Sequence, residues 1–146
     1  MLNRIEQSRR LLMLGLVGWV LSVQAMADVV VVVNKSNTDN LSAEQVQNLF
    51  LGKAKYFPNG KPALAIQLKE TAPAYQNFAK EYLHKDANQL RAYWSRLVFT
   101  GRASPPREVK DSAEVLQLVS TNPNLIGYVD NSDVHDFETV RLVKIQ

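Results

Sequence analysis

Five consecutive valines at positions 29–33 constrain the fold of this 146-residue chain more than any other feature. β-Branched side chains favour extended backbone, so the run predicts a β-strand. Because successive side chains of a strand point to opposite faces, a strand that is apolar throughout must be covered on both sides. We therefore expect this strand at the centre of a sheet that is flanked by helices.

Four later segments have the spacing and the start signals of helices. Gln45 stands three residues after Ser42, which is the pattern of a capping box. Apolar side chains recur every three or four residues within positions 75–83 and 90–98, which is typical of helices that bury one face. The N-caps predicted for the four helices are Ser42, Thr71, Asp86 and Ser112.

Three further strands are predicted at positions 63–68, 125–129 and 139–145. Pro105 and Pro106 forbid a helix and indicate an extended connection. Strands that alternate with helices in this order predict an α/β fold, with a mixed sheet flanked by helices in one three-layer-like domain.

The first 27 residues have the composition of a secretory signal peptide. A basic start is followed by an uncharged apolar run at positions 11–23 and by the A-x-A pattern of Ala25 and Ala27. The run is shorter than the roughly 20 residues that a spanning helix needs. We expect cleavage after Ala27, export to the periplasm and a single domain at 28–146.

Charge and cysteine content exclude several classes of protein. There is no cysteine, which rules out disulfides, iron–sulfur clusters and a cysteine nucleophile. The whole chain has 17 Lys and Arg against 14 Asp and Glu, but the predicted mature chain has 14 against 13. Because the basic residues are scattered along that mature chain, we expect no nucleic-acid binding.

No motif for catalysis stands out. His84 and His135 are the only histidines, and neither a G-x-S-x-G sequence nor a glycine-rich phosphate loop occurs. The acidic residues around His135 are best explained as a solvated loop. We therefore predict no enzyme activity, no catalytic residue, no metal site and no cofactor.

Anion binding remains open, because helix N-termini present free N–H groups and the positive end of the helix dipole. Polar loops precede three predicted helices, at positions 34–40, 69–71 and 110–112. From these residues alone, ordinary capping and a surface lysine are the better explanation. The candidate ligand-binding residues are Lys69, Thr71, Ser36 and Asn37.

Several segments together resemble a known family. They occur in the order 49–53 (LFLGK), a turn at 58–61 (PNGK), 93–94 (YW), 99–101 (FTG) with two prolines, and 126–129 (IGYV). This succession is similar to that of the phosphate-type periplasmic solute-binding proteins. The resemblance implies one lobe of the two-lobed type II periplasmic binding fold, in a short, single-lobe member.

The resemblance implies a periplasmic phosphate or oxyanion solute-binding-like protein associated with ABC-type phosphate transport. Its partners would be inorganic phosphate and a transporter permease. The resemblance also leads us to expect a Ser-Gly-Thr run at the start of the helix that carries Phe78, and this run is missing. In its place, Glu70 would repel an anion and Pro73 has no N–H to donate. The alternative is an envelope interaction module that has lost its ligand and contacts another envelope protein or forms a homodimer.

Overall fold

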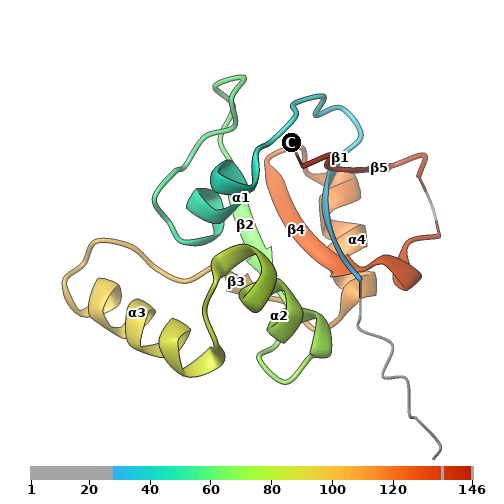
Figure 1. Cartoon of the computed structure of the whole chain (residues 1–146). Helices are drawn as coiled ribbons and strands as arrows, with labels where there is room; N and C mark the ends of the chain where they lie inside the picture. The colour runs from blue at the N-terminus through green and yellow to red at the C-terminus, as the bar shows by residue number, and fades with distance from the viewer. Residues whose placement is uncertain (1–27, 136, 146) are drawn as a thin grey trace, which may run out of the picture.

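The computed structural model describes residues 28–135 and 137–145, and its strands form one mixed sheet (Figure 1). The predicted signal peptide at 1–27 lies outside the described residues. The strand order is β3-β2-β4-β1-β5, with β2 parallel to β3 and β4, and β1 antiparallel to β4 and β5. The strands are β1 (Val29–Asn34), β2 (Leu64–Gln67), β3 (Arg107–Glu108), β4 (Leu125–Asp130) and β5 (Val140–Leu142).

The valine-rich strand lies inside the sheet, as predicted, but it is not the central strand. It pairs with β4 on one side and β5 on the other, whereas β4 occupies the middle. The difference arises from β3, a two-residue strand after Pro106 that the sequence analysis treated as a connection. A strand that short carries no alternating pattern, and it extends the sheet on the side of β4 away from β1.

Helices cover both faces of the sheet, so the predicted α/β fold with three layers is confirmed. Helices α1 and α2 cover one face, and α4 covers the other (Figure 1). None of the helices in the described part of the chain is long and apolar enough to cross a membrane. The helices are α1 (Ala43–Phe50), α2 (Pro73–Phe78) continued by the π-helix η1 (Ala79–Leu83), α3 (Ala87–Phe99), α4 (Ser112–Thr121) and the short 3-10 helix η2 (Asn131–Asp133).

Two predicted N-caps are confirmed, each as a complete capping box, and two are wrong. Thr71 does not cap α2, because Pro73 requires the residue before it to be extended and so moves the cap to the next position. Ser112 is the first residue of α4, which is capped by the aspartate before it. The N-caps of α1 to α4 are Ser42, Ala72, Asp86 and Asp111.

The core lies on both faces of β4. On one face the Tyr128 ring stacks on Phe78, with 4.0 Å between centroids, and Phe50 packs against both rings. On the other face Gly127 lets α4 approach closely, because a Cβ there would lie 2.7 Å from Cγ1 of Val115. In the described part of the chain, the buried residues of the core cluster fall between positions 29 and 143.

Helix α3 is the exception to the prediction that all four helices pack on the sheet. It projects from one side of the molecule (Figure 1), and of its apolar stripe only Leu90 and Trp94 are buried. Val98, which the spacing places on the same stripe, is 53% exposed. The neighbouring edge strand β3 has only two residues, both exposed, so it offers the helix little apolar surface.

Candidate functional site

Three parallel strands end at the same edge of the sheet. β3, β2 and β4 run in one direction, so the loops that follow them lie together, and α2 and α4 begin there. We call this the carboxyl edge: residues 68–72, 109–111 and 130–133. In open α/β sheets, ligands bind outside the carboxyl ends of the strands. The carboxyl edge is therefore the first place to test for a binding site.

Lys69 and Thr71 lie at this carboxyl edge, and both are exposed. The Lys69 carbonyl accepts a hydrogen bond from the Ala72 N–H at 2.9 Å, which closes the turn into α2. Among the described residues, neither side chain has a hydrogen-bond partner. Both side chains are therefore available to a ligand from solvent.

Ser36 and Asn37 lie at the opposite end of the sheet, because β1 runs antiparallel to β4. The Ser36 hydroxyl donates to Oδ1 of Asn34 at 2.7 Å. Asn37 is buried, and its carbonyl accepts from Nε of Arg141 at 2.7 Å, which fastens this loop to β5. The four candidate residues are thus divided between two ends of the sheet and form no common site.

Acidic side chains dominate the carboxyl edge and its immediate surroundings. Lys69 and Lys110 are its basic residues, and both are exposed. The Glu70 carboxylate forms an ion pair with Arg91 of α3 at 2.7 Å. Desolvating an anion close to several carboxylates is unfavourable, which weighs against tight oxyanion binding here. The acidic residues are Glu70, Glu108, Asp111, Asp130 and Asp133.

A cleft of about 380 Å³ lies between this edge and α3. Its wall includes Leu90 and Trp94 of α3, and Tyr75 of α2 lies opposite. The pKa of Tyr75 is raised, first by burial and then by Glu70 and Glu108, while Arg91 opposes them. A neutral phenol beside two carboxylates and one guanidinium suits a neutral or cationic polar ligand better than a phosphate. The polar lining residues are Gln67, Glu70, Tyr75, Arg91, Ser95 and Glu108.

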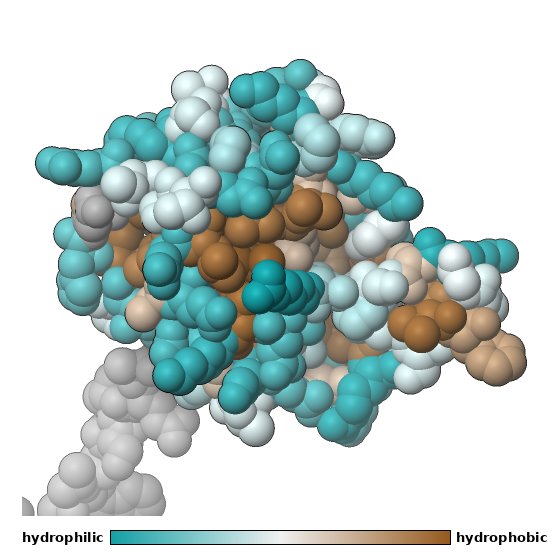
Figure 2. Space-filling view, turned by 180° about the vertical axis from the view of Figure 1, so that it is seen from behind, coloured by the Kyte–Doolittle hydropathy of each residue, from teal (hydrophilic) through white to brown (hydrophobic). Residues whose placement is uncertain are grey.

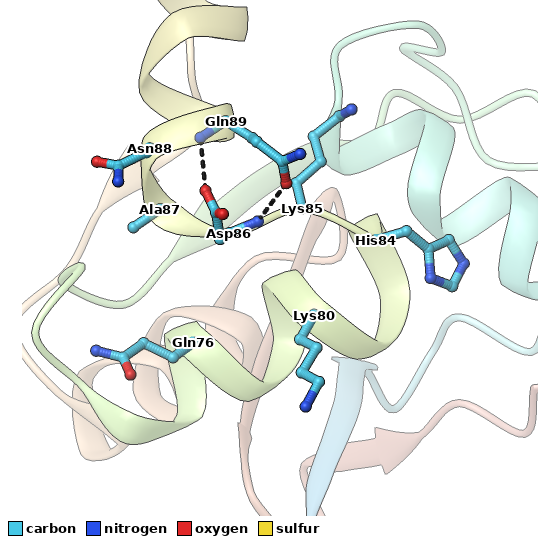
Figure 3. Close-up of a pocket in the computed structure, with 8 residues that line it drawn as sticks. All are labelled: Gln76, Lys80, His84, Lys85, Asp86, Ala87, Asn88 and Gln89. Atoms are coloured by element: carbon cyan, nitrogen blue, oxygen red, sulfur yellow. Dashed lines mark hydrogen bonds between the residues drawn. The ribbon is translucent and has the colours of Figure 1, made fainter.

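A larger hollow of about 730 Å³ lies between η1 and the start of α3 (Figure 3). Its basic side chains Lys80, His84 and Lys85 point in different directions. Asp86 is already engaged, because its Oδ1 accepts from the Gln89 N–H at 2.8 Å. The hollow therefore lacks polar groups that converge on a ligand. In the described part of the chain, no group of three His, Asp or Glu side chains is placed to hold a metal ion.

Comparison with known proteins shows the fold of phosphate receptors. No protein-family profile and no curated protein matches the sequence. A protein from Clostridium perfringens, identified as a phosphate ABC transporter substrate-binding protein and solved with bound phosphate, matches 80% of this chain and 44% of its own, at 20% identity and a TM-score of 0.61.

Two further structures agree. An ABC-type phosphate transport receptor from Vibrio cholerae matches 80% of this chain and 45% of its own, at 14% identity and a TM-score of 0.62. PstS from Borrelia burgdorferi matches 69% and 39%, at 14% identity and a TM-score of 0.51. The chain thus spans less than half the length of these proteins, which fits a single lobe of a periplasmic binding fold. The first two of these structural neighbours are named as a transporter substrate-binding protein and a transport receptor.

Proposed function

We propose that the chain is a periplasmic phosphate-binding-like protein that serves ABC-type phosphate transport with a single lobe. The observation that carries the proposal is the likeness of its fold, over 80% of the chain, to a substrate-binding protein solved with phosphate. In the proposal, residues 1–27 direct export and are removed, and a transporter permease is the protein partner.

Two features of the carboxyl edge support it as the oxyanion site. Lys69 and Thr71 follow β2 directly, and their side chains are exposed to solvent. The loop also lies beside the carboxyl end of β4, which runs parallel to β2, and open α/β sheets bind ligands outside the carboxyl ends of their strands. A single lobe contacts only one side of the anion, so we expect weaker binding than a closed clamshell would give.

A second function is favoured by the charge of the same edge. Five acidic residues lie at or beside the carboxyl edge, and Ser36 and Asn37 lie at the opposite end of the sheet. These observations support an envelope interaction module that keeps the lobe without its ligand. Such a module would bind another envelope protein or a second copy of itself.

Melting of residues 28–146 in phosphate, in sulfate and without either anion separates the two functions. If phosphate is the ligand, a concentration of 100 times its dissociation constant raises the free energy of unfolding by about 2.7 kcal/mol. Lys69→Ala and Thr71→Ala should each reduce that gain. Lys61→Ala, which removes an exposed lysine outside the carboxyl edge, is the matched control and should preserve it.

The opposite result is equally clear. Identical melting curves in phosphate, in sulfate and without anion would reject phosphate binding and support the interaction module. Native mass measured on the same samples then shows whether the module pairs with itself.

A further inference from the structure

The last turn of α3 exposes large apolar side chains to solvent. Phe99 is 93% exposed and Val98 is 53% exposed. In Figure 2, apolar side chains gather at the right, over the end of this helix, with hydrophilic ones around them. We call Arg96, Val98, Phe99 and Arg102 the α3 tip. An aromatic ring in water at the end of a projecting helix has an unfavourable free energy that a partner can relieve.

Basic residues are enriched in the segment of the chain that carries this tip. Residues 85–107 contain five Lys and Arg and one Asp, whereas the rest of the chain from position 28 contains nine basic and twelve acidic residues. Arg96, Arg102 and Arg107 are exposed. Among the described residues, Arg91 forms an ion pair with Glu70. The projecting segment is therefore positive, and the remainder of the molecule is negative.

Shape and charge together select the partner. The helix end projects from the molecule (Figure 1), and its Phe99 ring is 93% exposed, so the ring is not part of a pocket for a small ligand. An anionic surface would attract residues 85–107 and repel the acidic remainder of the chain. The molecule would therefore approach such a surface with the α3 tip first. Each basic residue near an anionic bilayer contributes about 1 kcal/mol, and apolar side chains add to this when they enter the headgroup boundary. We propose that the α3 tip docks on the surface of a bilayer that contains anionic phospholipid.

Docking on lipid is independent of phosphate binding, since the α3 tip and the carboxyl edge share no residue. The test uses residues 28–146, which hold all buried core residues of the described part of the chain, because the apolar run at 11–23 would itself bind lipid. Sedimentation with vesicles compares phosphatidylglycerol mixed with phosphatidylcholine against phosphatidylcholine alone. We expect binding to the anionic vesicles, and we expect it to fall as the salt concentration rises.

Variants of exposed residues test the contact without disturbing the core. Phe99→Ala should lower the partition coefficient on anionic vesicles about tenfold. Phe137→Ala, which removes an aromatic ring that is 53% exposed outside the tip, should leave it unchanged. Replacing Arg96 and Arg102 together by Gln should lower binding and flatten its salt dependence.

Three results would overturn the proposal. One is no binding to either kind of vesicle. Another is equal binding to both kinds, and the third is an equal effect of the two phenylalanine substitutions. If vesicles are not bound and Phe99→Ala instead abolishes a concentration-dependent dimer, the tip contacts a second copy of the chain.

Discussion

At the scale of single residues, Tyr128 connects the sheet to the helical layer above it. Its ring lies parallel to Phe78, at an interplanar angle of 3°, and its hydroxyl accepts a hydrogen bond from the buried Leu68 N–H at 3.2 Å. Burial raises the pKa of Tyr128, and the Leu68 hydrogen bond opposes that shift only in part. The phenol therefore stays protonated in the folded protein well above the pH at which a free tyrosine ionises.

This pKa predicts a loss of stability in alkali. An unfolded tyrosine ionises near pH 10, so the stabilisation is complete below that pH and is lost as the pH rises above it. One such group lowers the free energy of unfolding by about 1.4 kcal/mol per pH unit. Urea unfolding at a series of pH values between 8 and 11 measures how the free energy of unfolding depends on pH. Tyr128→Phe should be less stable at pH 8, because Leu68 loses its acceptor, and should show a shallower decline.

Tyr75, Tyr82 and Tyr93 also have raised pKa values, mainly through burial, so part of the decline should persist in Tyr128→Phe. An alkaline slope that is the same in wild type and Tyr128→Phe would show that the ionisation of Tyr128 is not linked to unfolding.

At the scale of elements, the start of helix α4 has two adjacent residues that could act as its N-cap, Asp111 and Ser112. Oδ1 of Asp111 accepts from the Glu114 N–H at 2.9 Å, whereas Ser112 is already helical. Asp111→Ala should therefore lower the free energy of unfolding by about 1 kcal/mol, and Ser112→Ala should change it by less than half as much. Urea unfolding at pH 7 compares the two variants. If the two substitutions lower the free energy of unfolding equally, the prediction that Asp111 alone is the N-cap is wrong.

The elements show what local sequence determines. The helical spacing of 75–83 and the valine run at 29–33 predicted real elements, because each has enough residues to show a period. β3 could not be predicted in this way, since two residues form a strand only through their pairing with β2. The basic segment at 85–107 was missed for another reason: the charge of the whole mature chain nearly cancels, whereas residues 85–107 alone are strongly basic.

At the scale of the whole molecule, strand direction determines which loops meet. Ser36 and Lys69 each follow a strand and each precede a helix, so the sequence gives them equivalent positions. Their strands run in opposite directions, and the loops open at opposite ends of the sheet. Local pattern does not encode this direction. It follows from the pairing of β1 with β4, which are more than 90 residues apart in the chain.

The same long-range pairing predicts that β1 is locally much more stable than α3. Hydrogen exchange on residues 28–146, measured peptide by peptide, compares the two elements. β1 is paired on both edges, so its amides should exchange only on global unfolding. The buried residues of α3 are Leu90 and Trp94. The Tyr93 hydroxyl also donates a hydrogen bond to the Leu51 carbonyl, which connects α3 to the end of α1. The amides of α3 should therefore exchange on the order of 100 times faster than those of β1.

Helix α4 is the internal control, because it has a similar length but packs on β4 and β1 with Val115 and Val119 fully buried. Its amides should be protected much more strongly than those of α3, although both helices have good N-caps. Capping alone contributes only about 1 kcal/mol, so the contrast isolates the contribution of packing on the sheet. Equal protection of α3 and α4 would mean that α3 is held by contacts stronger than its two buried side chains provide.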